Sequence, residues 1–426
     1  MDSKISQLMK KLFIISMTLL LCVVSSCVCN SEKSIARKVD ATMKRMSVRD
    51  KVAQLVVVQI DRNNNEAERS EQDSLVEMGL GGIIIMRGPV VPFMNRMNEL
   101  QSKSKIPLIV CTDAEWGAAM RFYEYPDYPY QSQLTNIPDA EPLLYEMGLN
   151  VARELKDLNI LVNFAPVADM AEEGDDNYHF RRFGPGIELV SNYCSAYMRG
   201  LQDGGVYACG KHFPGHGNVM IDSHVEMPVF DYTRAQMDSA YLAPFRRLID
   251  DGVAFMMMGH HCIPSIDSAM IPMSISRKCV TDLLKDEMGF DGIVVTDALR
   301  MGGVANGRTP VEVMVSAYKA GVDMLLMPDT PIAGIEAIAS MVESGELSIE
   351  ELDSKVRKVL TLKAKAGLLD RFYSPRVENI PEKIEQARIR DFELIERMNA
   401  ALAEVDTTST KSEKQDGTLI LDRGRD

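Results

Sequence analysis

Residues 206–217 read VYACGKHFPGHG, a short apolar run that ends in polar residues and a loop. The run from Val206 to Lys211 has the length and apolar content of a strand buried on both faces, as in a parallel sheet. A Pro-Gly pair at residues 214–215 ends the run, because proline has no N–H for a β-ladder and glycine favours turns. The sequence therefore predicts a buried strand that delivers Lys211 and His212 at its carboxyl end.

Seven further runs of this kind occur between residues 52 and 330, and helix-like segments separate many of them. The eight predicted strands are Val52 to Ile60, Gly82 to Met86, Pro107 to Thr112, Ile160 to Pro166, Val206 to Lys211, Ala254 to Gly259, Gly292 to Thr296 and Asp323 to Met327. Helices are predicted at Pro142 to Leu158, Ile187 to Gln202, Arg234 to Asp250, Val280 to Met288 and Pro310 to Ala320. Eight strands alternating with helices predict an α/β fold, a (β/α)₈ TIM-type barrel with extra C-terminal helices. An open, doubly wound sheet gives the same alternation, but the count of eight and the lack of a glycine fingerprint after the first strand disfavour it.

The barrel domain is expected over residues 40–370. Residues 348–368 and 382–405 read as helices that pack outside the barrel, with residues 371–405 as a C-terminal helical extension. From Asp406 the composition turns to Thr, Ser, Lys, Glu and Gly, which predicts a disordered tail over residues 406–426.

The first residues have the form of a signal peptide. Three lysines precede an apolar run from Leu12 to Val24, and two serines then lead to Cys27. The run is shorter than the roughly 20 residues that a spanning helix needs. We expect residues 1–26 to be removed and Cys27 to be lipidated; an ordinary cleaved signal peptide is the alternative. The expected location is therefore a membrane-anchored lipoprotein on the periplasmic or outer-membrane face of a Gram-negative bacterium, held to the membrane by the lipid alone.

Charge and cysteine usage exclude several classes of partner. The net charge of -14 over 426 residues leaves no sequence-wide basic surface for phosphate backbones, so no nucleic acid is expected as a partner. The cysteines beyond the signal show no repeated short spacing and no CxxC pattern, so neither a zinc site nor a disulfide is predicted. A monomer is expected.

Chemically competent side chains gather after the predicted strands, where a barrel places its functional groups. The densest group is KHFPGHGNVMIDSHVEMP at residues 211–228. His212 and His216 stand four residues apart like helical metal ligands, but the intervening proline and glycine break any helix, so no metal is predicted. Asp222 precedes His224 by two residues and can orient its ring and raise its pKa, which suits a proton donor. Histidines that only brace a loop remain the alternative.

These motifs resemble a known enzyme family. KHFPGHG followed by DSH, together with VVTDALRMGGV at residues 294–304, is similar to glycoside hydrolase family 3, and within it to the bacterial NagZ-type β-N-acetylglucosaminidases (β-N-acetylhexosaminidases). VNFAPVAD at residues 162–169 and LKAKAGLLD at residues 362–370 extend the resemblance from about Met46 to Asp370.

The resemblance implies a role for each matching residue. Asp297 would be the nucleophile, His224 the general acid/base and Asp222 its partner. The sugar-binding groups would be Asp113, Arg121, Arg181, Lys211 and His212. A surface or packing salt bridge is the alternative for each of these last residues. The implied activity is hydrolysis of terminal β-linked GlcNAc, with retained configuration, from cell-wall or chitooligosaccharide-like glycans, and it needs no cofactor.

Other functions stay open at this point. A family 3 β-glucosidase, a GlcNAc phosphorylase and an inactive sugar-binding surface lipoprotein are the alternatives. The loop at residues 170–180 departs from the Asn/Pro-rich loop usual in the family. Tyr123, Tyr125, Tyr128 and Tyr130 either stack on a second sugar or pack against the barrel. Gly259-His260 matches a family strand end to which no role is given.

Overall fold

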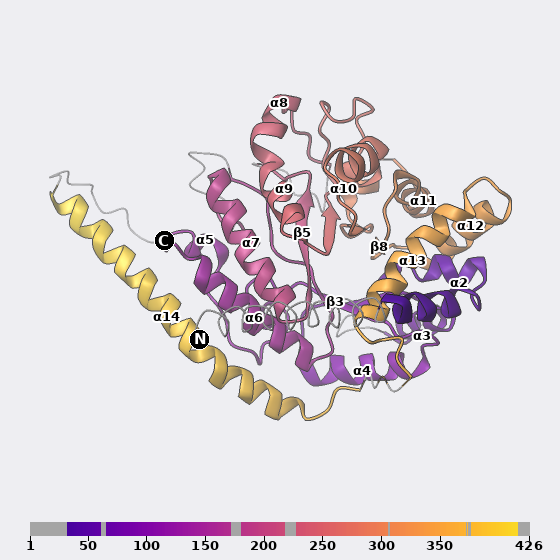
Figure 1. Ribbon diagram of the computed structural model, residues 1–426, viewed down its shortest axis with the longest axis horizontal. Helices are drawn as coiled ribbons and strands as arrows, with labels where there is room; N and C mark the ends of the chain where they lie inside the picture. Colours follow the sequence, from indigo (N-terminus) through magenta and orange to yellow (C-terminus); the bar gives the residue numbers. More distant parts are fainter. Residues whose placement is uncertain are drawn as a thin grey trace, which may run out of the picture.

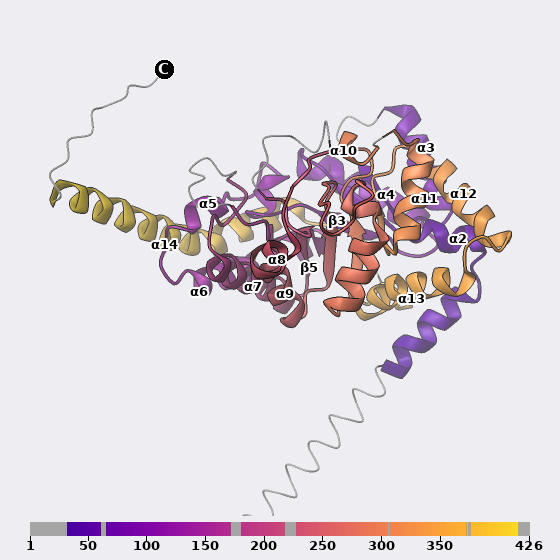
Figure 2. The same ribbon diagram turned by 90° about the horizontal axis from the view of Figure 1, so that it is seen from above.

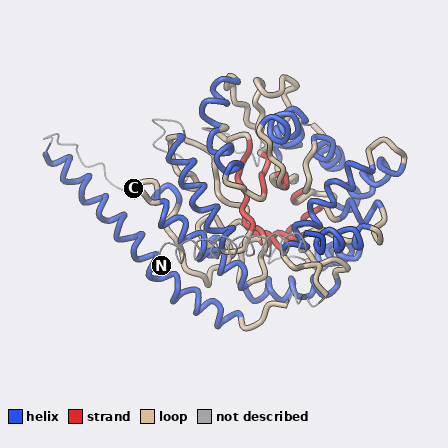
Figure 3. The backbone as a smooth tube through the Cα atoms, in the orientation of Figure 1, coloured by secondary structure: helices blue, strands red, loops and turns tan. Residues whose placement is uncertain are grey.

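A central parallel sheet organises the chain. The structure, a computed structural model, describes residues 32–60, 65–171, 180–217, 227–305, 307–371, 373 and 376–415. Within these residues eight strands pair in the order β7-β6-β5-β4-β3-β2-β1-β8, and every pairing is parallel. The strands are β1 (Val56–Ile60), β2 (Gly82–Ile85), β3 (Ile109–Thr112), β4 (Val162–Asn163), β5 (Tyr207–Phe213), β6 (Phe255–Met258), β7 (Ile293–Thr296) and β8 (Leu325–Leu326). Figure 3 shows these strands gathered at the centre, with the helices outside them.

The two ends of this sheet meet and close it. β1 pairs with β8, and Val295 of β7 forms a parallel bridge with Met324 just before β8. The N–H of Thr296 donates to the carbonyl of Met324 at 3.1 Å. The predicted (β/α)₈ barrel is confirmed.

Helices surround the barrel and extend beyond it at the C-terminus (Figure 1). Their bounds are α2 (Val48–Ala53), α3 (Glu66–Glu77), α4 (Val90–Lys103), η1 (Ala118–Met120), α5 (Gln131–Leu134), α6 (Glu141–Asp157), α7 (Ile187–Asp203), α8 (Arg234–Gln236), η2 (Met237–Tyr241), α9 (Ala243–Asp250), η3 (Met273–Ile275), η4 (Lys278–Glu287), α10 (Gly302–Ala305), α11 (Pro310–Ala320), α12 (Pro331–Glu343), α13 (Ile349–Lys365) and α14 (Ile380–Gln415). Residues 32–43 are also helical. No helix in the described ranges is both long enough and apolar enough to cross a membrane.

Glycine lets two of the outer helices approach closely. A Cβ on Gly148 of α6 would lie 2.4 Å from the carbonyl oxygen of Tyr197, and one on Gly200 of α7 would lie 2.1 Å from that of Tyr145. Any larger residue would force these helices apart, because backbone atoms cannot move aside as a flexible side chain can. This contact fixes the helices that flank β4 and β5, which carry part of the site.

Several predicted elements differ from the structure, and two of the differences have a clear local cause. The strand predicted from Val52 begins only at Val56, because residues 48–53 form α2, whose N-cap Ser47 makes a capping box with Asp50. The helix predicted over residues 234–250 contains a π-helical turn, in which the N–H of Leu242 donates to Met237. Proline at position 244 has no N–H and would clash with the carbonyl four residues earlier, so a wider turn accommodates it.

The C-terminal helix α14 crosses the outside of the barrel, and its last part projects beyond it in both views (Figures 1 and 2). It packs against α6, and its residues Ala387, Leu394 and Met398 are buried. The helix continues to Gln415, past residue 406, where the tail was predicted to begin. Extending an existing helix needs no new nucleus, and Lys, Glu and Gln are good helix formers. Residues 416–426 lie outside the described residues.

A carboxyl pair is buried where α14 meets α6. Glu154 of α6 and Asp391 of α14 are both 0% exposed. The N–H of Ala118 donates to Glu154 at 2.9 Å, and Arg390 pairs with Asp391 at 2.8 Å. Burial first, and then the charge of Asp391, raises the pKa of Glu154 well above its usual value. The folded chain therefore keeps a proton on Glu154 over a pH range in which the unfolded chain loses it.

Glu154→Gln should make stability less sensitive to pH. Above the ordinary pKa of a glutamate, about 4.3, the unfolded wild-type chain releases this proton but the folded chain keeps it, so the free energy of unfolding of the wild type falls as pH rises. A glutamine side chain does not titrate, so the variant does not lose this stability. The variant should therefore gain free energy of unfolding relative to wild type as pH rises from 4 to 8, with no gain at pH 4. Urea unfolding at both pH values measures this, with exposed Glu188→Gln as the control. A difference between variant and wild type that does not change with pH would contradict the argument.

Candidate active site

The predicted site residues that the structure describes lie at the carboxyl ends of the strands. Asp113 follows β3, and Asp297 follows β7. Lys211 and His212 lie near the carboxyl end of β5. Arg181 comes from the segment before α7. Because parallel strands end on the same side of a barrel, segments far apart in the sequence contribute to one group of side chains.

A buried lysine joins β3 to β5. Lys211 is 1% exposed, and its Nζ lies 2.8 Å from Oδ1 of Asp113 and 2.6 Å from Oε1 of Glu115. Burial lowers the pKa of Lys211, but the two carboxylates outweigh it and raise this pKa overall. The lysine is therefore held charged inside the protein.

Two arginines complete this network. Arg121 pairs with the carboxylate of Asp113 and donates from Nε to its backbone carbonyl at 3.1 Å. Arg181 binds Glu115 with both Nε and Nη2, at 2.8 and 2.7 Å. Burial raises the pKa of Glu115, yet the charges of Arg181 and Lys211 lower it to about 2. We call these five residues the ionic network: Asp113, Glu115, Arg121, Arg181 and Lys211.

Sequence reasoning assigned four members of the ionic network and missed Glu115. The signal was available, because three predicted cations had Asp113 as their only assigned anion. Buried charges need partners, so a second carboxylate was required nearby. Glu115 stands two residues after Asp113 and is itself 0% exposed.

A second chain of contacts runs from β4 to β7 through a histidine. Asp169 lies 2.6 Å from Nδ1 of His212 and accepts the backbone N–H groups of His212 and His216 at 3.1 and 2.7 Å. Nε2 of His212 then lies 4.0 Å from Oδ2 of Asp297. Asp169 was given no role from the sequence, and it orients the ring that faces Asp297.

Asp297 is set up to stay ionised. Burial raises the pKa of Asp297, but the charges of His212 and His260 and a hydrogen bond from the N–H of Ala298, at 2.7 Å, outweigh it and lower this pKa. The side chain is 20% exposed, so the carboxylate is accessible as well as charged. His260 contacts the carbonyl of Ala298 at 3.0 Å and the hydroxyl of Ser274 at 2.7 Å. His260 therefore braces the turn that carries Asp297.

Three predicted residues, Asp222, His224 and Cys27, lie outside the described residues. The four tyrosines of the loop after β3 differ in their exposure: Tyr125 and Tyr128 are buried, whereas Tyr123 and Tyr130 are exposed.

No metal cluster is present in the part of the chain that the structure describes: no three His, Cys, Asp or Glu side chains are placed to hold an ion. The cysteines that it describes, Cys111, Cys194, Cys209, Cys262 and Cys279, are buried and free.

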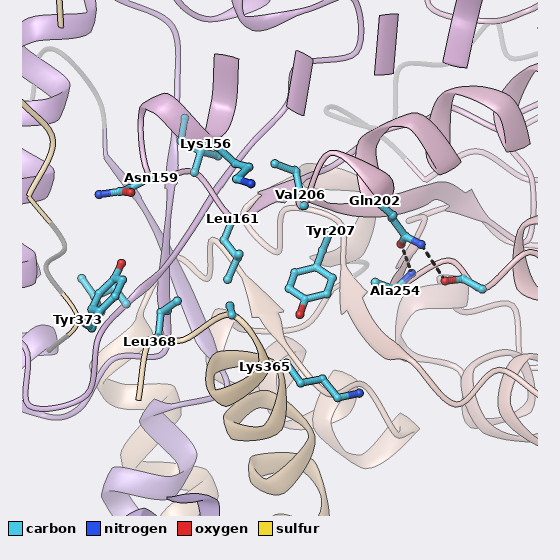
Figure 4. A pocket seen from close by; sticks show the side chains of 15 residues that line it. Lys156, Asn159, Leu161, Gln202, Val206, Tyr207, Ala254, Lys365, Leu368 and Tyr373 are labelled. Atoms are coloured by element: carbon cyan, nitrogen blue, oxygen red, sulfur yellow. Dashed lines mark hydrogen bonds between the residues drawn. The ribbon is translucent and has the colours of Figure 1, made fainter. Parts of the chain in front are cut away.

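A cavity of about 530 Å³ lies at the opposite end of the barrel (Figure 4). It is lined where strands begin, by residues such as Leu161, Tyr207 and Ala254, together with Lys156 and Lys365. Gln202 bridges this wall by hydrogen bonds to Gly252 and Ala254, at 3.0 and 2.9 Å. No member of the ionic network lines this cavity, so it is separate from the candidate active site.

Glu115→Gln should destabilise the fold by about 3–5 kcal/mol, because it removes one of the two carboxylates that pair with buried Lys211 and the carboxylate that pairs with Arg181. The difference in free energy of unfolding between wild type and variant should be largest above pH 4.3, the usual pKa of a glutamate. It should shrink as pH falls toward about 2, where Glu115 of the folded wild type is itself protonated. Denaturant unfolding measures both effects. Glu99→Gln is the matched control, because Glu99 also pairs with two cations, Arg96 and Lys103, but is 44% exposed and should matter by less than about 1 kcal/mol. Equal losses in the two variants would refute the importance of this ion pair.

Comparison with known proteins finds one matching family and several relatives. The domain described as Glycosyl hydrolase family 3 N terminal domain matches residues 47–362. The beta-hexosaminidase of Nitrosospira multiformis is 32% identical over 291 residues, 66% of this chain and 83% of that protein. The beta-hexosaminidase of Chromobacterium violaceum is 33% identical over 295 residues, 67% of this chain and 81% of that protein. The solved structure of a glycoside hydrolase family 3 beta-N-acetylglucosaminidase from Paenibacillus is 30% identical, with a TM-score of 0.73, and the match covers 84% of this chain and 69% of that one. The chain therefore belongs to glycosyl hydrolase family 3 and is a glycoside hydrolase related to the β-hexosaminidases.

Proposed function

We propose that this family 3 enzyme is a retaining exo-β-N-acetylglucosaminidase, which removes terminal β-linked GlcNAc from cell-wall or chitooligosaccharide-like glycans. The observation that carries the proposal is the accessible, ionised carboxylate of Asp297 after β7, beside His212 and the ionic network. The names of the β-hexosaminidase relatives support the choice of sugar.

The reaction would proceed in two steps. Asp297 attacks the anomeric carbon while His224 protonates the departing oxygen, so that a covalent glycosyl-enzyme forms. His224 then takes a proton from water, which attacks the same carbon and releases GlcNAc with its configuration retained. Asp222 would orient the ring of His224 and raise its pKa. All of these steps use side chains of the chain itself.

The ionic network would bind the terminal sugar. Asp113 offers acceptors to hydroxyl groups, and Arg121, Arg181 and Lys211 offer donors that are already held in place. His212, fixed by Asp169, would contact the sugar beside Asp297. Because these groups are paired before the substrate arrives, little ordering remains to be done on binding.

Substitutions at the two catalytic positions should have different effects. Asp297→Ala should lower kcat/KM for p-nitrophenyl β-GlcNAc by at least about 10³-fold, because the attacking group is lost. His224→Ala should lower kcat/KM for methyl β-GlcNAc by about 10²–10⁴-fold, but less for the nitrophenyl substrate, whose leaving group needs little protonation. Asp291→Ala, an exposed position just before β7, should leave both rates unchanged. Release of GlcNAc by Asp297→Ala at the wild-type rate would disprove the nucleophile. Formation of GlcNAc-1-phosphate when phosphate is added would instead identify a phosphorylase.

We further propose that the protein is exported and anchored to the membrane by a lipid on Cys27. The support is the basic start, the short apolar run and the two serines before Cys27. The full-length chain expressed in a Gram-negative host should partition into the detergent phase of Triton X-114, and Cys27→Ser should move it into the aqueous phase. Wild type found only in the aqueous phase would argue against the anchor.

A further inference from the structure

Three aromatic side chains form a cluster, and two of them are sequence neighbours of members of the ionic network. Trp116 follows Glu115 in the sequence, Phe180 precedes Arg181, and Tyr130 is the N-cap of α5. The ring centroids lie 5.1 Å apart for Trp116 and Tyr130, 5.4 Å for Trp116 and Phe180, and 4.8 Å for Tyr130 and Phe180. We call Trp116, Tyr130 and Phe180 the aromatic platform.

The aromatic platform is exposed although its rings pack on one another. Tyr130 is 42% exposed and Phe180 is 40% exposed, while Trp116 is partly buried against the core. The N–H of Ser132 in α5 donates to the carbonyl of Phe180 at 3.2 Å, which ties the two segments together. Large apolar groups that stay clustered at a surface commonly mark a binding site. Here the rings are held in place before any ligand arrives.

The aromatic platform and the ionic network share two chain segments, Glu115–Trp116 and Phe180–Arg181. Arg181 binds Glu115 through both guanidinium nitrogens, and Glu115 also contacts Lys211. Trp116 and Phe180 are the immediate neighbours of this ion pair. Two of the three rings therefore stand one residue along the chain from side chains that would hold the terminal sugar.

We propose that the aromatic platform binds a second sugar ring of the substrate, the one to which the terminal GlcNAc is linked; this rests on the proposed function. The C–H face of a pyranose packs on aromatic rings, and the Tyr hydroxyl and Trp N–H can bond to its hydroxyl groups. The area favours a sugar over a second copy of the chain, because three side chains cannot supply the roughly 800 Å² per partner of a stable protein interface. The enzyme then prefers β-linked oligosaccharides over GlcNAc on a small aglycone.

The test compares two substrates that differ only in the second ring. Methyl β-GlcNAc lacks it, whereas N,N′-diacetylchitobiose has it and, unlike a nitrophenyl glycoside, brings no aromatic aglycone. Phe180→Leu and Tyr130→Leu should each lower kcat/KM for the disaccharide by about fivefold to tenfold and change that for the methyl glycoside less than about twofold. Phe180→Tyr keeps the ring and should retain the preference. Phe392→Leu, a 63% exposed aromatic position on α14, should change neither rate.

Each other outcome overturns the assignment. Equal losses on both substrates would mean that the rings only support the terminal-sugar site, and unchanged rates on both would mean that no sugar contacts them. A wild-type dimer in sedimentation that the variants abolish, without a change in substrate preference, would assign the surface to a second copy. If wild type cleaves the methyl glycoside but does not prefer the disaccharide over it, the platform proposal alone fails. If wild type cleaves neither substrate, the proposed function fails with it.

Discussion

A lysine ammonium group held inside the protein is the constraint on which the site depends. Lys211 is fully enclosed, and an unpaired charge there would cost several kcal/mol. Asp113 and Glu115 satisfy it, and Arg121 and Arg181 in turn satisfy them. Since Lys211 belongs to β5 and both carboxylates follow β3, these ion pairs hold two strand ends in one relative position. The sugar-binding groups are thus fixed by the same contacts that stabilise the fold.

The charges also act on the residue after β7. The ionic network has three cations and two anions, so it carries a net positive charge. The charges of His212 and then of His260 lower the pKa of Asp297 most, and Lys211 adds a smaller effect. Without these charges burial would raise the pKa of this carboxylate, and a protonated carboxyl group attacks poorly. Lys211, which would bind the sugar, therefore also helps His212 and His260 to keep the proposed nucleophile ionised.

The sequence predicted those elements whose ends carry local signals. Helix α11 runs from Pro310 to Ala320 as expected, because Thr309 caps it and Gly321, with φ of 107°, ends it. The π-helical turn inside the predicted helix at residues 234–250 has no cap or stop residue of this kind; Pro244 interrupts the helix there, but a proline does not specify which turn will accommodate it. In the site, a family resemblance could name Asp297 and Lys211. It assigned nothing to Glu115, although the excess of predicted cations over anions called for a second carboxylate, and nothing to Asp169, whose role appears only once distant strands are brought together.

A crystal structure of the protein with GlcNAc bound tests the central claim most directly. The account predicts a single sugar ring beside Asp297 and His212, with its hydroxyl groups on Asp113 and Arg181. A sugar bound instead in the cavity at the opposite end of the barrel, among Lys156, Tyr207 and their neighbours, with the strand ends left empty, would contradict it.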